Sequence, residues 1–274
     1  MTTSAPTPPD GGRTHRLSWL GARVVIGLFL LMLAAEVIIR LTAPHSLDAA
    51  GMDSRTYLDA TRRWLNGGPF YLPTQLAGPY QIEYGVVLYP PVALLLFVPF
   101  AFLPAVLWYA IPATIMAAVI WHHRPSAWAC TIIIAVLALS PETQTNYWFG
   151  TPTIWIAAFV ALGTIWGWPG VLVMLKPAVF PFALLGIRDR RWWLAAGVLT
   201  IVSLLFLPMW FDWFRVLLNA RGPRANVLYA IGDVPPLAMP LVAWAGRRRG
   251  SIGSRPRRGA PYAPRARFKD DVGR

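Results

Sequence analysis

Asp53 and Tyr57 are the residues whose types and spacing most directly suggest chemistry. They lie four positions apart, so on a helix they share one face. The carboxylate of Asp53 can act as a general base toward a sugar hydroxyl. A long apolar stretch follows the polar segment that holds it, which favours chemistry on a lipid-borne substrate. A structural alternative is that Asp53 only caps the start of a helix.

Lys176 is the second candidate. A lysine in the middle of an apolar span costs roughly 3 kcal/mol on membrane-insertion scales, which makes it a functional candidate by default. Pro177, the next residue, frees a backbone carbonyl and permits a kink. The expected partner of the lysine is an anion such as a lipid phosphate. The structural alternative is an ion pair with Glu142 or Glu36.

Signals for metal or cofactor chemistry are missing from the sequence. His122 and His123 are adjacent, so on a helix they point in different directions, which argues against a shared metal site. There is also no glycine-rich phosphate-binding loop and no Ser-His-Asp arrangement. We therefore expect no metal and no cofactor.

The composition points to a membrane. Of the 274 residues, 56% are hydrophobic and only 14% are charged, which is too apolar for an ordinary water-soluble domain of this length. Between Val86 and Ile187 the only formal charges are Arg124, Glu142 and Lys176. In lipid, backbone groups must be satisfied within the segment, so such runs become helices. We predict an all-α, polytopic membrane protein with about eight transmembrane helices.

The net charge of +13 is concentrated in one tail. From Arg247 to Arg274 there are ten Lys or Arg residues and two Asp residues. This pattern is typical of a cytoplasmic terminus that attracts anionic membrane lipids. Nucleic acid is not an expected partner, because the tail offers only Tyr262 and Phe268 for stacking and no folded basic domain.

Three regions follow from this pattern. We expect a disordered cytoplasmic leader at 1–16, a transmembrane domain at 17–246 and a basic disordered cytoplasmic tail at 247–274. The first extracytoplasmic loop, 43–85, should contain an amphipathic helix at about 54–66 that lies along the membrane interface. Further apolar segments follow at about 86–103, 104–121, 127–140, 151–166, 168–187, 192–210 and 228–246. Several are short or interrupted by prolines, so we expect broken or tilted helices.

The positive-inside rule suggests an orientation. With the N-terminus inside, about eight crossings place the basic segments 188–191 and 247–249 inside as well. The same count places 122–124 outside, against the rule. A re-entrant segment within 86–121 would reverse this, so the side of 122–150 stays open.

Several short motifs occur in a recognisable order. Taken alone, Tyr89-Pro90-Pro91 fits the start of a helix at a membrane interface. The full order is Asp53, Tyr57 and Ala60, then Gly67, Gly68 and Tyr71, then Tyr89-Pro90-Pro91, then Leu175-Lys176-Pro177 in a span closed by Arg188-Asp189-Arg190-Arg191-Trp192. Over about residues 20–215 this order resembles glycosyltransferase family 87. That family comprises bacterial, largely actinobacterial, membrane mannosyltransferases of the GT-C superfamily.

The resemblance implies a GT-C-like fold in the cell membrane with its active site on the extracytoplasmic face. It implies transfer of a hexose, such as mannose, from a polyprenyl-phosphate sugar donor to a lipid or cell-envelope glycan acceptor, with inversion. By this resemblance Asp53 would be the catalytic base, and Lys176 would be structural or donor-binding. The expected substrate-binding residues are Arg55, Tyr57, Asp59, Tyr89 and Lys176.

Two features depart from the family's pattern. Where the family usually shows Gly-Gln-x-Asn, this chain has Gly150-Thr151-Pro152-Thr153. The chain is also shorter than typical members and changes at Gly246 into Arg/Pro/Gly low complexity, so we expect a short or truncated member. The alternatives are a catalytically inactive membrane scaffold or fragment and, with less support, a small-molecule or lipid transporter. No internal repeat of the kind found in many transporters is visible.

Overall fold

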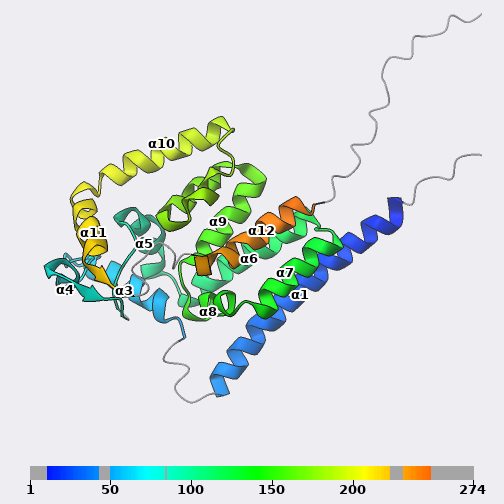
Figure 1. The fold of residues 1–274 in the computed structure, drawn as a ribbon, viewed down its shortest axis with the longest axis horizontal. Helices are drawn as coiled ribbons and strands as arrows, with labels where there is room; N and C mark the ends of the chain where they lie inside the picture. Colours follow the sequence, from blue (N-terminus) through cyan, green and yellow to red (C-terminus); the bar gives the residue numbers. More distant parts are fainter. Residues whose placement is uncertain (1–10, 43–49, 84, 223–230, 248–274) are drawn as a thin grey trace, which may run out of the picture.

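The computed structural model describes residues 11–42, 50–83, 85–222 and 231–247. These residues are mostly helical, as the composition predicts, and their arrangement is shown in Figure 1. The α-helices are α1 (Gly11–Thr42), α3 (Met52–Leu65), α4 (Pro73–Ala77), α5 (Leu94–Phe102), α6 (Ala105–His123), α7 (Ala127–Leu139), α8 (Pro141–Phe149), α9 (Thr153–Trp166), α10 (Arg190–Leu204), α11 (Leu207–Asn219) and α12 (Val234–Ala245). Three 3-10 helices, η1 (Pro91–Ala93), η2 (Trp168–Leu175) and η3 (Pro177–Leu184), complete the helical part, and two short strands, β1 (Tyr80–Gln81) and β2 (Ala220–Arg221), pair in parallel.

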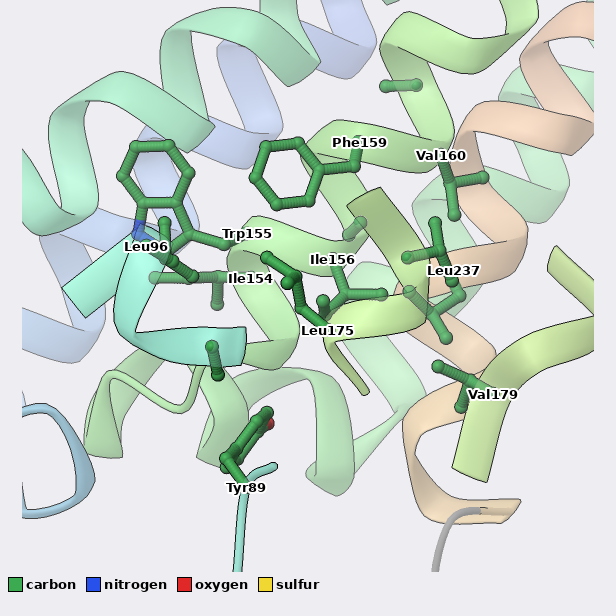
Figure 2. Packing of buried hydrophobic residues seen from close by; sticks show 14 of the residues in the cluster. Tyr89, Leu96, Ile154, Trp155, Ile156, Phe159, Val160, Leu175, Val179 and Leu237 are labelled. Carbon is green, nitrogen blue, oxygen red and sulfur yellow. The ribbon is translucent and has the colours of Figure 1, made fainter. Parts of the chain in front are cut away.

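Helix α9 lies at the centre of the core. Its residues 153–161 are all buried, because its sequence is apolar on every side and α6, α12 and η2 pack around it. Figure 2 shows Ile154, Trp155, Ile156, Phe159 and Val160 of this helix within the buried cluster. The outer helices instead expose large apolar side chains, such as those of Val198 and Ile201 on α10, a surface suited to lipid.

Long straight spans are rare in this fold. Within the described ranges, α6 is long and apolar enough to cross a membrane, whereas α7 with α8 and α10 with α11 reach that length only as pairs bent by 66° and 88°. This measure gives one span, or up to three, where the sequence predicts about eight. The expectation of broken helices is confirmed: prolines lie inside α5, α6, α12 and η3, and the apolar segment 168–187 forms two 3-10 helices separated at Lys176.

The predicted amphipathic helix is present as α3, two residues earlier at its start than expected. Ser54, Leu58, Ala60 and Thr61 are buried, while Arg55, Asp59 and Arg62 are exposed. That α3 lies along a membrane interface stays a prediction. Helix α1 begins at Gly11, inside the predicted leader, while Asp48 and the basic tail from 248 onward lie outside the described residues.

The C-terminal ends of α6, α9 and α12 meet at one end of the molecule, beside α1 (Figure 1). We call this end the basic end. The Arg124 guanidinium, just after α6, lies 4.0 Å from the ring centroid of Trp19 on α1. Pro125 forms an antiparallel bridge with Arg247, just after α12. His123 at the end of α6 lies 2.7 Å from Thr164 near the end of α9.

The position of 122–124 bears on the open question of sidedness. The count of about eight crossings separated this segment from the chain termini. The structure places it beside both Trp19 and Arg247, so 122–124 shares an end with the N-terminal half of α1 and with the start of the basic tail. The count of crossings and the structure differ because the segment before α6 does not form an independent straight helix. There, η1 and α5 together cover only 91–102, and α5 packs against α3.

Candidate functional site

The backbone at the start of α3 positions Asp53. Gly51 occupies the N-cap with φ of 67°, a left-handed conformation that favours glycine, and its N–H donates to the carbonyl of Trp148 at 2.9 Å. Asp53 is therefore the second residue of the helix and not its cap. The alternative that Asp53 is the N-cap is wrong, because Gly51 occupies that position. The contact with Trp148 holds the first turn of α3 against the end of α8.

A cavity of about 360 Å³ opens at this junction, and we call it the acidic cavity. Four carboxylates line it, one from α3, one from the loop after β1, one from α8 and one from the start of α12: Asp53, Glu83, Glu142 and Asp233. Polar and apolar side chains complete the wall, among them Thr56, Tyr57, Thr145, Asn146, Phe149 and Leu88. Its volume falls in the range of small-molecule sites, about 300–1,000 Å³.

Lys176 makes a buried ion pair behind this cavity. Its Nζ lies 2.7 Å from Asp233 Oδ2 and donates a hydrogen bond to Thr153 Oγ1 at 2.8 Å. The Thr153 hydroxyl in turn donates to Asp233 Oδ1 at 2.8 Å. Lys176 is 6% exposed and Asp233 4% exposed, so water screens this network weakly.

The ion pair corrects one expectation from the sequence. The structural alternative paired Lys176 with Glu142 or Glu36; among the described residues the ion pair is with Asp233 and not with Glu142. Glu142 instead lines the acidic cavity beside Gly232. The side chain of Glu36 lies outside the described residues. Lys176 itself does not line the cavity, because Asp233 and Thr153 surround its ammonium group.

Tyrosines connect the cavity wall to Lys176. The ring of Tyr57 lies 5.0 Å, edge to face, from that of Tyr89, and the Lys176 Nζ lies 5.8 Å from the Tyr89 ring centroid. Tyr71 donates its hydroxyl to the Tyr89 carbonyl at 2.9 Å. Burial, with a smaller contribution from Asp212, raises the pKa of Tyr71 well above its ordinary value, so this hydroxyl stays protonated as a donor. Figure 2 shows Tyr89 at the edge of the apolar core.

The predicted site residues fall into three groups. Asp53 and Tyr57 line the acidic cavity. Tyr89 and Lys176 are buried behind its wall. Arg55 and Asp59 are exposed residues of α3 that do not line it, and Asp59 accepts a 2.8 Å ion-pair contact from Arg62.

Sequence reasoning missed Asp233. Two signals could have identified it: it is the last carboxylate before the basic tail, and it directly precedes an apolar segment. A buried lysine also requires a counterion. Within the described ranges there is no group of three or more His, Cys, Asp or Glu residues that could hold a metal ion.

Comparison with known proteins gives one match. A family model described as Glycosyltransferase family 87 matches residues 88–254. This range contains Lys176, Glu142 and Asp233 but begins after α3, so Asp53 and Tyr57 lie before it. No curated protein and no solved structure matches the chain.

Proposed function

Because the chain belongs to glycosyltransferase family 87, and is therefore a membrane glycosyltransferase, we propose that the acidic cavity is its catalytic centre. The proposed reaction moves a hexose, such as mannose, from a polyprenyl-phosphate sugar donor to a lipid or cell-envelope glycan acceptor. The observation that carries the proposal is the convergence of Asp53 with three further carboxylates on one cavity large enough for a small-molecule ligand.

Asp53 is the proposed general base. Its carboxylate takes the proton of an acceptor hydroxyl while the acceptor oxygen forms a bond to the anomeric carbon of the donor. The bond between that carbon and the phosphate oxygen breaks, and polyprenyl phosphate leaves with the electron pair. Attack opposite the leaving group inverts the configuration at the anomeric carbon. A positioned base contributes about 10²–10⁴-fold to such a step.

The remaining carboxylates suit sugar recognition. Carboxylate oxygens accept hydrogen bonds from hydroxyl groups, and charge-assisted bonds of this kind are the strong ones. Glu142 and Asn146 on α8 and Asp233 at the start of α12 therefore serve as the proposed hexose contacts. Lys176 acts through Asp233: the ion pair at 2.7 Å fixes the orientation of that carboxylate.

The donor phosphate requires a different position. The described residues that line the acidic cavity include no lysine or arginine, so a phosphate inside it would meet the like charges of their carboxylates. Arg55 lies on the exposed face of α3, two residues from Asp53. We assign the phosphate to this side of α3, at the mouth of the cavity, with the hexose directed inward and the polyprenyl chain toward lipid.

The test is sugar transfer by the purified protein. Wild-type protein, polyprenyl-phosphate-mannose carrying a radiolabel and a bacterial lipid acceptor fraction should yield labelled product. Asp53→Asn should lower the rate by about 10²-fold or more, because the amide preserves shape but cannot take the proton. Asp59→Asn is the matched control on the same helix and should transfer normally. Normal transfer by Asp53→Asn, or none by the wild type, would contradict the proposal.

A further inference from the structure

The basic end carries a second hollow, far from the acidic cavity. Trp19, Leu20 and Arg23 of α1 and Trp121 of α6 line a groove of about 600 Å³, which we call the basic groove. The two tryptophan rings meet edge to face with centroids 4.4 Å apart. Sugar transfer at the acidic cavity uses none of these residues.

Two arginines flank the tryptophans. The Arg23 guanidinium carbon lies 5.8 Å from the Trp121 ring centroid, and that of Arg124 lies 4.0 Å from the Trp19 ring centroid. Each guanidinium stacked on an indole face keeps its planar edge oriented, and that edge is the part that donates paired hydrogen bonds to a phosphate. Among the described residues that line the groove there is one cation, Arg23, and no carboxylate.

The surroundings of the groove are apolar. Leu17, Leu20 and Val24 of α1 expose more than two fifths of their surface each, at 61%, 58% and 44%. A phosphate bound to Arg23 in this groove would therefore have hydrocarbon-compatible side chains beside it. Tryptophan side chains also favour the level of lipid headgroups. This combination matches a molecule with an anionic head and an apolar tail.

We propose that the basic groove binds the phosphate headgroup of an anionic phospholipid. Charge complementarity and the adjoining exposed leucines select this occupant over an inorganic anion or a second copy of the chain. The bound lipid would join α1 to the end of α6 and would hold this end at the headgroup level of an anionic leaflet. Lipid binding at the basic groove does not depend on sugar transfer, so this proposal is independent of the proposed function.

The test compares lipids on the purified, full-length protein by native mass spectrometry. Phosphatidylglycerol should be retained in preference to phosphatidylcholine. The double variant Arg23→Gln/Arg124→Gln should bind phosphatidylglycerol about thirtyfold more weakly, since each arginine near a lipid surface contributes a factor of about five. Arg215→Gln, which changes an exposed arginine of α11, is the matched control and should bind normally.

Other outcomes would overturn the proposal. Equal retention of both lipids by the wild type would show that the groove does not recognise the charge. Displacement of phosphatidylglycerol by an equal concentration of inorganic phosphate would show a small-anion site. Unchanged binding by the double variant, or dimerisation that depends on Arg23 and Arg124, would also contradict it. A melting temperature measured without added lipid checks that the double variant is folded.

Discussion

The two ends of this molecule carry opposite charges on different kinds of backbone. At the acidic cavity, carboxylates arrive from a glycine-capped first turn, a loop, a short bent helix and the residue just before α12. At the basic end, Arg23, Arg124 and Arg247 lie in or directly after the long helix α1 and the helices α6 and α12, and each is stacked on a tryptophan. The comparison teaches that helix starts and a loop build the cavity, whereas the basic end gathers its arginines on α1 and at the ends of α6 and α12.

A physical reason underlies this division. An interrupted helix frees backbone groups and directs side chains inward, which a membrane protein tolerates only where the segment is buried in protein or lines a cavity. Lys176 illustrates the point, because it lies in extended backbone between η2 and η3 and still finds two buried partners. A straight helix end instead suits arginine and tryptophan, which favour the interface.

The sharpest contrast between the ends should appear in chemical labelling of intact cells. Both ends expose residues that can be replaced by cysteine, Asp59 on α3 and His122 on α6. A membrane-impermeant maleimide should label Asp59→Cys from outside, because the positive-inside rule predicts that the basic end faces the cytoplasm. It should label His122→Cys only after the membrane is opened. Native Cys130 is buried and serves as the unlabelled control. Labelling of both positions from one side would show that the two ends lie on the same side of the membrane and would contradict this contrast.

Breaking the buried ion pair should have the next largest effect. Lys176→Met leaves Asp233 as an unpaired buried charge, which destabilises a fold by about 3–5 kcal/mol. Asp233→Asn should destabilise it similarly by leaving the ammonium group without its counterion. The double variant Lys176→Met/Asp233→Leu should regain stability, because apolar residues of similar size can replace a buried pair.

Transfer activity distinguishes two roles of the Lys176–Asp233 ion pair, support of the fold and binding of the hexose. If Asp233 contacts the hexose, the double variant should be stable and should still fail to transfer sugar. Thermal unfolding and transfer rate measured on the same preparations decide this. A double variant with wild-type stability and wild-type rate would show that the pair only supports the fold, and it would remove Asp233 from the site.

Gly232 offers the smallest and most local change. A Cβ atom at this position would lie 3.4 Å from Glu142 Cδ, in van der Waals contact, so Gly232→Ala should fill space beside that side chain at the cavity wall. We expect a few-fold rise in KM for the donor and little change in kcat, because the base is untouched. Gly197→Ala, which meets nothing within 4 Å on α10, is the control. A fall in kcat alone would indicate that Glu142 takes part in the chemistry.

Local signals in the sequence were enough to predict some elements. The helix expected at about 54–66 is α3, because its charged and apolar residues alternate with a helical period. Pro90 and Pro91 begin a 3-10 helix, close to the helix start expected from tandem proline. Family membership, which the order of motifs suggested, is confirmed by the match over 88–254.

Features that depend on distant contacts were beyond such signals. Asp233 and Thr153 surround Lys176 from 57 and 23 positions away in the sequence, and no periodicity links them. The position of 122–124 depends on how 86–103 folds, which is decided by packing of α5 against α3. The contacts of α3 with α8 likewise determine which of its carboxylates faces the cavity.

The central claim is that Asp53 performs chemistry at the acidic end and does not merely shape it. The most direct measurement follows donor binding and release of polyprenyl phosphate by one preparation of Asp53→Asn. Our account predicts that the variant binds polyprenyl-phosphate-mannose with wild-type affinity while product release falls by about 10²-fold or more. Release at the wild-type rate, or a loss of affinity large enough to explain the lost release, would contradict it.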